Sequence, residues 1–249
     1  MNFFICFLLT FLAGISTTLG YFIIFIKKNK QDIILTSALS FASSVMFFIS
    51  FLDLIPESFN MLKIDFETIF VILTIMLFFV IGVLISIFIE KTIPEQKSTN
   101  GSLYKIGLIS MLAIIIHNIP EGMATFISSY NDISLGLLLT FSIALHNIPE
   151  GISIALPIYY STNKKNKAFL YTLISGFSEV FGGIIAYFLL RPFINNITLG
   201  VLFSIIAGIM FHISIFSLLK TSLSYKNYKL TFKYFILGPI IVIISRIII

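Results

Sequence analysis

Long apolar stretches, each of about 20 residues or more, follow one another along almost the whole chain, with only short polar segments between them. A helix that crosses the hydrocarbon core of a membrane needs roughly 20 apolar residues. Of the 249 residues, 58% are hydrophobic and 11% are charged, and the mean hydropathy is +1.06. A soluble domain cannot bury that much apolar surface, whereas lipid accepts it. The sequence therefore predicts an all-α polytopic membrane protein.

We predict eight transmembrane helices in a single domain that covers residues 1–249. The first apolar run is too long for a signal-peptide core, and its lysines follow it, so it is predicted to be a transmembrane helix. Residues 91–104 hold a proline, a glycine and several Ser, Thr and Asn residues, and are predicted to be a surface loop. The single cysteine, Cys6, excludes an internal disulfide and a thiolate metal cluster. The predicted helices span about 3–26, 33–57, 66–89, 106–129, 133–160, 168–190, 197–219 and 232–249.

Lysine and arginine are concentrated in alternate loops. Thirteen of the 16 basic residues lie in, or within two residues of, the first, third, fifth and seventh predicted loops. Because cytoplasmic loops carry an excess of basic residues, these loops are predicted to be cytoplasmic and both termini external. The net charge of +5 thus reflects membrane topology and does not indicate a nucleic-acid partner.

One six-residue motif occurs twice. His117-Asn118-Ile119-Pro120-Glu121-Gly122 recurs as His146-Asn147-Ile148-Pro149-Glu150-Gly151. Each histidine comes about a dozen residues into its predicted helix, which places it near the middle of the bilayer. The fourth helix is predicted to run outward and the fifth inward, so the two motifs meet antiparallel at the same depth.

Carboxylates inside the predicted spans need a partner. Glu121, Glu150 and Glu179 lie centrally, and each costs about 2.5–3.5 kcal/mol at the bilayer centre on insertion scales. No lysine or arginine lies near the middle of any predicted span, which argues against a buried salt bridge. Protonation of the carboxyl groups is one alternative. A bound cation is favoured because two histidines accompany two of the glutamates.

The spacing inside the motif supports a cation site. His117 and Glu121 are four residues apart, as are His146 and Glu150, and residues at that spacing share one helix face. Two facing helices would offer two imidazole nitrogens and two carboxylates to one point. This ligand set suits zinc, ferrous iron, manganese or cobalt and does not suit cuprous copper.

Three further polar residues are interpreted with an alternative beside each. Glu179 lies about eleven residues into its helix and is a candidate metal ligand, or a structural residue capped by Ser or Asn. Asn118 and Asn147 are candidates for metal contact and, equally, for helix packing.

Residues nearer the ends of the spans are interpreted separately. Asp53 and Glu57 lie toward the outer face and are candidate entrance residues, or ordinary interfacial residues. His212 has no carboxylate at helical spacing and is interpreted as a packing histidine.

These motifs resemble the ZIP (Zrt/Irt-like) family of metal transporters, most closely its bacterial ZupT-like branch. The resemblance rests on the paired His-Asn-x-Pro-Glu-Gly motifs in the fourth and fifth helices. It extends to residues 50–56 (SFLDLIP) and to residues 176–183 (GFSEVFGG) around Glu179. With the eight-helix layout and external termini, the similarity covers nearly the whole chain.

The resemblance implies a fold in which helices 1–3 and 6–8 are inverted repeats around helices 4 and 5. It also implies a site for two metal ions. Family members generally bring zinc, iron, manganese or related ions into the cytoplasm. His117, Glu121, His146 and Glu150 match one metal position, and Asn118, Asn147 and Glu179 match the second, with the motif glutamates shared.

The chain departs from the family pattern in two places. Residues 207–214 (AGIMFHIS) resemble the seventh helix, which bacterial relatives usually continue with acidic residues and a proline. Here the continuation is residues 215–220 (IFSLLK), so any role of those acids in the metal path is lost or moved. The predicted loop 91–104 has no histidine, so the His-rich loop of many eukaryotic members is absent.

We therefore predict a divalent metal transporter and not an enzyme. Its substrates are zinc, iron, manganese, cobalt or cadmium, which the sequence does not rank, and no cofactor is expected. The bilayer is its other partner, a homodimer is left open, and a bacterial plasma (inner) membrane is the expected location.

Two alternatives remain. An intramembrane zinc-dependent hydrolase would use two histidines and a glutamate around zinc to activate water, but no His-Glu-x-x-His motif exists here. A metal sensor or scaffold is the other, although duplication and an inverted layout are expected for alternating access and not for a sensor or scaffold.

Overall fold

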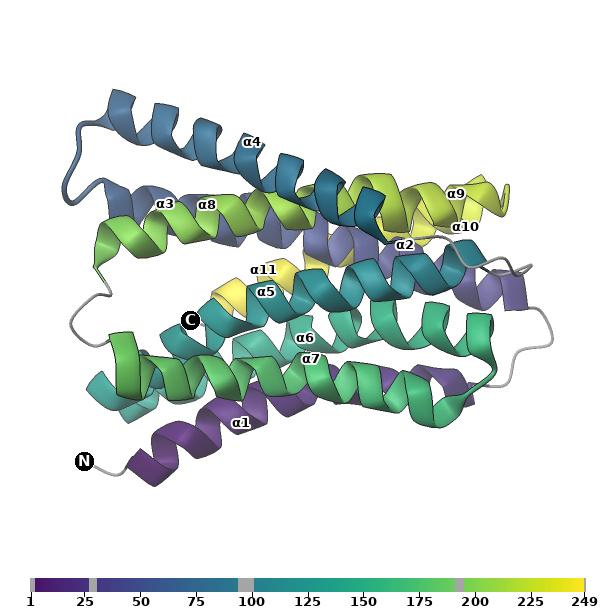
Figure 1. Ribbon diagram of the computed structural model, residues 1–249, viewed down its shortest axis with the longest axis horizontal. Coiled ribbons are helices and arrows are strands. Elements are labelled where there is room, and N and C mark those ends of the chain that lie inside the picture. Colours follow the sequence, from purple (N-terminus) through teal and green to yellow (C-terminus); the bar gives the residue numbers. More distant parts are fainter. Residues whose placement is uncertain (1–2, 27–30, 94–100, 191–194, 249) are drawn as a thin grey trace.

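The computed structural model describes residues 3–26, 31–93, 101–190 and 195–248, and every regular element in these ranges is a helix (Figure 1). Eight helical segments are long and apolar enough to cross a membrane. The predicted all-α polytopic fold is therefore confirmed. These segments, called spans 1 to 8 here, are Phe3–Phe25, Gln31–Leu62, Thr68–Thr92, Gly101–Tyr130, Ile133–Thr162, Lys165–Phe188, Asn196–Ser224 and Tyr228–Ile247.

Several spans consist of more than one helical element. Span 3 is α4 (Thr68–Thr92), span 4 is α5 (Gly101–Asn131) and span 5 is α6 (Ile133–Thr162). The others contain 3₁₀ or π-helical turns, or a break. Span 1 is α1 (Phe3–Leu19) and η1 (Gly20–Phe25); span 2 is α2 (Gln31–Ile49), η2 (Ser50–Leu54) and α3 (Ile55–Leu62); span 6 is α7 (Lys165–Ile185) and η3 (Ala186–Leu190); span 7 is α8 (Asn196–His212), η4 (Ile213–Leu219) and α9 (Lys220–Ser224); span 8 is α10 (Tyr228–Phe235) and α11 (Gly238–Ile248).

Several helix boundaries differ from prediction by up to five residues, and at two of them burial continues past the apolar run. Helix α5 begins at Gly101, where residues up to 104 were predicted to be loop, and Leu103 and Tyr104 in its first turns are buried. Residues 94–100 of that predicted loop lie outside the described residues. Span 2 continues to Leu62, which is fully buried against Val71 of α4.

The spans form two groups in the bundle. Spans 1, 4, 5 and 6 pack on one another, with α5 against α6 and α7 and α1 against the same two helices. Spans 2, 3, 7 and 8 form the second group, in which α4 packs on α8 and α2 on α10 and α11. In Figure 1 the first group lies below and the second above. Helix α6 contacts α2 and α11, and α5 contacts α8, where the groups meet.

Glycines bring the backbones of the first group into direct contact. A Cβ added at Gly122 of α5 would overlap the carbonyl of Glu179 on α7. A Cβ added at Gly151 of α6 would likewise overlap the carbonyl of Thr17 on α1. Small residues allow such close approach between transmembrane helices. The motif glycines therefore fix α5 on α7 and α6 on α1 at the depth of the motifs.

Spans 1 and 6 make equivalent contacts in opposite directions. Residues 10–20 (TFLAGISTTLG) and 172–182 (TLISGFSEVFG) are identical at four positions, namely Thr10/Thr172, Gly14/Gly176, Ser16/Ser178 and Gly20/Gly182. Gly14 and Gly176 meet, each facing the other's carbonyl. The carbonyls of Thr17 and Glu179, at matching positions, face the two motif glycines. Because consecutive spans alternate in direction, these matched contacts relate the two spans as inverted repeats.

Spans 2 and 7 repeat in the same way. Residues 46–50 (MFFIS) and 210–214 (MFHIS) precede or begin the π-helical turns η2 and η4. The Ser58 hydroxyl donates to the carbonyl of Gly200 at 2.6 Å, and the Ser222 hydroxyl donates to that of Thr36 at 2.8 Å. Span 3 packs on span 7 as span 8 packs on span 2. The inverted-repeat arrangement around α5 and α6 is thus confirmed by the helix contacts.

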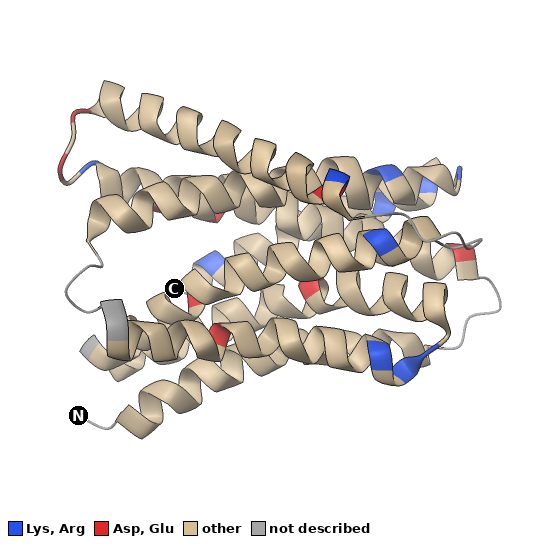
Figure 2. Ribbon diagram, viewed as in Figure 1, with Lys and Arg blue, Asp and Glu red and all other residues tan. Residues whose placement is uncertain are grey.

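The two ends of the bundle differ in charge. Both chain ends lie at one end, here called the terminal side, together with the α3–α4 and α5–α6 connections (Figure 1). Most described lysines lie at the opposite end, here called the basic side (Figure 2). Lys63 and Arg246 are the described basic residues of the terminal side.

Candidate metal centre

The two motifs meet inside the first group of spans. His117 and Glu121 lie on α5, and His146 and Glu150 lie on α6. All four are buried, with Glu150 fully inaccessible and Glu121 8% exposed. Each pair lies midway along a helix of about 30 residues, which places the cluster far from both ends of the bundle.

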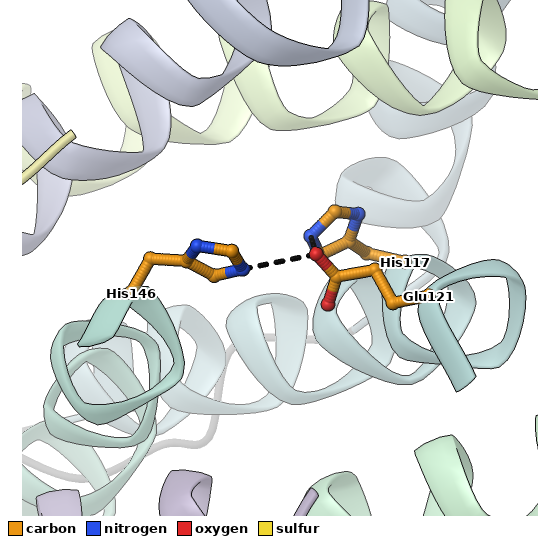
Figure 3. A group of neighbouring side chains, drawn as sticks. All are labelled: His117, Glu121 and His146. Atoms are coloured by element: carbon orange, nitrogen blue, oxygen red, sulfur yellow. Dashed lines mark hydrogen bonds and ion pairs between the residues drawn. The ribbon is translucent and has the colours of Figure 1, made fainter. Parts of the chain in front are cut away.

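Three of the four side chains converge on one point (Figure 3). The carboxylate oxygen Oε1 of Glu121 lies 2.9 Å from Nε2 of His146 and 3.1 Å from Nε2 of His117. One ligand atom from each of these three residues lies within 4.8 Å of the other two. Glu121 therefore bridges both motifs. Sequence spacing alone pairs Glu121 with His117 on the same helix, because the contact with His146 depends on how α5 faces α6.

Glu150 lies beside this cluster. Its Oε1 is 3.7 Å from Nε2 of His117, and neither of its carboxylate oxygens has a hydrogen-bond partner among the described residues. The four predicted ligands are thus neighbours, but three of them form the compact set and the fourth flanks it. Their role as metal ligands remains a prediction.

The two motif asparagines are held in equivalent ways. The side-chain amide of Asn118 donates to the carbonyl of Ser175 on α7 at 3.0 Å, and that of Asn147 donates to the carbonyl of Ala13 on α1 at 3.1 Å. Asn147 also donates to Oε2 of Glu179 at 2.9 Å. Both Oδ1 atoms have no donor among the described residues. The amides therefore serve in helix packing and leave their oxygens available to a cation.

Glu179 is fully buried on α7, and its Oε1 has no hydrogen-bond partner among the described residues. The alternative interpretation of Glu179 was a structural residue capped by Ser or Asn, and Asn147 donates to this carboxylate. The hydrogen bond from Asn147 satisfies only one of the two carboxylate oxygens of Glu179, so Oε1 remains available to a ligand.

The centre is rich in acceptors and poor in cations. Within the described residues, no lysine or arginine lies within ion-pair distance of Glu121, Glu150 or Glu179. Burying a polar atom without a hydrogen-bond partner costs folding free energy, and burying an unpaired carboxylate costs more. A divalent cation held by imidazole nitrogens and carboxylate oxygens would satisfy these atoms, and this donor set suits zinc and its neighbours.

A cavity of about 520 Å³ connects the terminal side with the cluster. Glu121 and His146 line its inner end, and Asp53 of η2 and Glu57 of α3 line it farther out. The two predicted entrance residues therefore lie on a route to the histidines. Their role in that route remains a prediction.

The contacts of Arg246 and His212 were not predicted from the sequence because they join helices that are far apart along the chain. Nε of Arg246 on α11 lies 3.1 Å from Oδ1 of Asp53, and Arg246 also lines the cavity. Nδ1 of His212 lies 2.9 Å from the hydroxyl of Ser86 on α4, and its Nε2 lies 3.8 Å from Glu90. His212 is buried away from the motifs, in keeping with a packing histidine. The similarity between residues 79–90 and 235–246 was the available sequence signal, because it places Glu90 and Arg246 at equivalent positions of spans 3 and 8.

Comparison with known proteins places these features in a family. The sequence model described as ZIP zinc transporter matches residues 94–245. A zinc transporter ZupT of Streptococcus mutans is 40% identical over 97% of this chain and 96% of its own length. The chain is also similar to zinc transporters ZupT of Campylobacter jejuni, at 40% identity over 89% of this chain and 88% of the relative. A zinc transporter ZupT of Clostridium perfringens is 38% identical over 98% of this chain and 95% of its own length.

Proposed function

This chain belongs to the ZIP family of zinc transporters, and we propose that it brings zinc or a closely related divalent ion into the cytoplasm through the buried His/Glu centre. Family membership makes it an integral membrane protein that transports divalent metal, and a transporter rather than an enzyme. No observation favours the hydrolase alternative. What is proposed here is the set of residues, the direction and the preferred ion.

The observation that carries the proposal is the cluster of His117, Glu121 and His146. It combines two imidazole nitrogens with a carboxylate oxygen, all buried and all within 4.8 Å of one another. Oε1 of Glu150 lies 3.7 Å from Nε2 of His117. Zinc binds four such ligands at about 2.0–2.2 Å, so small side-chain movements would close this set around one ion. We assign the first metal position to these four residues.

A second ion would use the oxygens beside this cluster. Asn118, Asn147 and Glu179 each present an oxygen that has no donor among the described residues, and Glu179 is not part of the compact histidine set. Two divalent cations repel at short range, so carboxylates shared between them would be needed to hold both. We therefore propose that Glu121 and Glu150 bridge the two positions.

The cavity supports access from the terminal side. Asp53 and Glu57 make its mouth acidic, which attracts cations. In the inverted repeat, residues 50–57 (SFLDLIPE) correspond to residues 214–221 (SIFSLLKT), so Asp53 corresponds to Ser217 and Glu57 to Thr221. A release route past these residues toward the basic side would meet hydroxyls where the mouth has carboxylates. A cation is held more weakly there, which favours release.

The distribution of lysines supports the same direction. All described basic residues except Lys63 and Arg246 lie on the basic side, and basic loops face the cytoplasm. The terminal side would then be external, and transport from the cavity to the basic side would be uptake across a bacterial plasma membrane.

The centre belongs entirely to spans 4, 5 and 6, so we propose that the first group moves against the second to give alternating access.

The test is metal uptake by the purified full-length protein in sealed liposomes containing a metal-sensitive dye. Zinc should enter saturably, and a panel of ferrous iron, manganese, cobalt and cadmium would give the preference. His146→Gln should abolish uptake and tight binding. The matched control is His212→Gln, another buried histidine remote from the motifs, which should keep both. Absence of flux for every ion, or normal flux in His146→Gln, would refute the proposal.

A further inference from the structure

An arginine lies in the acidic cavity through which the cation is proposed to pass. Nε of Arg246 is 3.1 Å from Oδ1 of Asp53, and both residues line the cavity together with Glu57, Glu121 and His146. A fixed positive charge in a cation route raises the energy of an entering divalent ion. Its presence there therefore needs a physical explanation.

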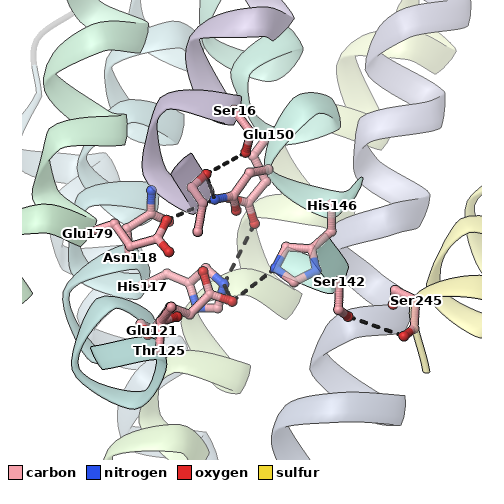
Figure 4. A network of polar contacts seen from close by, with 12 residues as sticks. Ser16, His117, Asn118, Glu121, Thr125, Ser142, His146, Glu150, Glu179 and Ser245 are labelled. Carbon is pink, nitrogen blue, oxygen red and sulfur yellow. Dashed lines mark hydrogen bonds and ion pairs between the residues drawn. The ribbon is translucent and has the colours of Figure 1, made fainter. Parts of the chain in front are cut away.

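Arg246 is held on the wall opposite the metal ligands. It lies on α11 and Asp53 on η2, both in the second group, whereas Glu121 and His146 belong to the first. The hydroxyl of Ser142 on α6 donates to the carbonyl of Ser245 at 3.2 Å, which keeps the residue before Arg246 close to α6 (Figure 4). The guanidinium is thus tethered at the place where the two groups meet.

The positive charge is not a requirement of helix packing. Residues 79–90 (FVIGVLISIFIE) and 235–246 (FILGPIIVIISR) are the repeated parts of spans 3 and 8. Gly82 packs closely against Ile205 of span 7, and Gly238 packs closely against Ser44 of span 2. Arg246 therefore corresponds to Glu90 at the opposite end of the bundle. The same backbone position holds a carboxylate in one repeat and a guanidinium in the other, so the fold does not select the charge.

Stability does not explain the pair either. The side chain of Arg246 is 48% exposed and that of Asp53 is 27% exposed. Ion pairs with this much exposure contribute little to folding. What the tether does provide is a high local concentration of guanidinium at the Asp53 carboxylate. Any free cation must compete with it for that carboxylate.

We propose that Arg246 occupies Asp53 as a built-in competing cation, which a transition-metal ion displaces and abundant hard cations do not. This inference rests on the proposed uptake route. Zinc forms direct bonds to carboxylates and loses water readily enough to replace a guanidinium, whereas Mg²⁺ gives up its water reluctantly. Arg246 therefore protects the entrance from Mg²⁺ at the cost of a weaker initial attraction for zinc.

The test is zinc uptake in liposomes with and without millimolar Mg²⁺. Wild-type uptake should be insensitive to Mg²⁺. Arg246→Gln should lower the KM for zinc on the order of fivefold at low salt, with kcat nearly unchanged, because one repelling charge is removed. Mg²⁺ should then raise that KM again. Arg246→Lys should retain most of the protection, and Arg246→Met gives a second neutral variant should the glutamine variant fold poorly.

Two controls separate this role from a general electrostatic effect. Lys63→Gln removes a basic residue of the same side that bonds Thr68 outside the cavity lining, and should change neither KM nor Mg²⁺ sensitivity. In an Asp53→Asn background, Arg246→Gln should add no Mg²⁺ sensitivity, since the contested carboxylate is gone. Mg²⁺-insensitive uptake by both neutral variants, or equal sensitivity with and without Asp53, overturns the inference. A wild-type protein that moves no metal overturns the proposed function instead.

Discussion

Glu179 of α7 and Thr17 of α1 occupy equivalent positions in the two inverted halves. The carbonyl of Glu179 contacts Gly122 of the first motif, and the carbonyl of Thr17 contacts Gly151 of the second. The backbone is therefore repeated at this depth while the side chains differ. Only one half contributes a carboxylate, so the proposed second metal position is confined to the side of the centre nearest α7.

Replacing Glu179 with Gln should reduce bound zinc from two ions per chain to about one. The change keeps the shape and the bond from Asn147 but removes one charge from a fully buried position. Transport should slow rather than vanish, since the His117–Glu121–His146 cluster is intact. Metal analysis of purified protein at saturation measures this, and a wild-type protein that binds only one ion would contradict the two-ion assignment.

Thr17→Val is the matched control for that variant. It changes the equivalent position of the other half, and the Thr17 hydroxyl has no hydrogen-bond partner among the described residues. Removing an unpaired buried hydroxyl is close to neutral for stability. We expect two zinc ions per chain to remain. Loss of an ion in Thr17→Val would show that the second position is not confined to the α7 side.

Glu121→Gln should weaken zinc binding more than Glu150→Gln. Glu121 contacts both histidines, at 2.9 and 3.1 Å, whereas Glu150 lies 3.7 Å from one. We expect affinity to fall by roughly 100-fold, about 2.7 kcal/mol, for Glu121→Gln, and by less for Glu150→Gln. Competition with a zinc chelator gives both values. Equal losses would mean that the metal-bound centre is symmetric in the two motifs.

Gly122→Ala should disturb the centre through the backbone. The new methyl group would overlap the carbonyl of Glu179 and force α5 away from α7, at about 1–3 kcal/mol. Thermal unfolding in detergent should begin at a lower temperature, and zinc affinity should fall. Gly183→Ala is the control, because its methyl group would meet the Thr10 side chain at 3.1 Å, where a small adjustment suffices. Equal stability of the two variants would contradict this account.

The proposed orientation can be tested with single cysteines in a Cys6→Ser background. Cys6 is buried, so its replacement removes an inaccessible thiol. Asp65→Cys is on the exposed α3–α4 connection and Asn166→Cys is on the exposed first turn of α7, at the opposite end. An impermeant maleimide applied to intact cells should label Asp65→Cys alone. The reverse labelling pattern would invert the proposed direction of transport.

Much of the fold could be predicted because lipid imposes a simple rule on the sequence. Each span must satisfy its own backbone hydrogen bonds and present apolar side chains for about 20 residues, and this is readable locally. Helix ends were less predictable. Leu62 and Leu103 extend their helices past the predicted limits because each is buried by a neighbouring element, which no local pattern reports.

The sequence by itself determined the depth and the chemistry of the centre. Helical periodicity places His117 beside Glu121, and His146 four residues before Glu150 on one face, since both depend only on spacing along one helix. The tertiary structure alone decided which of these atoms meet. Glu121 reaches His146, Asn147 reaches Glu179 and Arg246 reaches Asp53. These contacts join separate helices, and their distances depend on close glycine packing and on how the two groups of spans face each other.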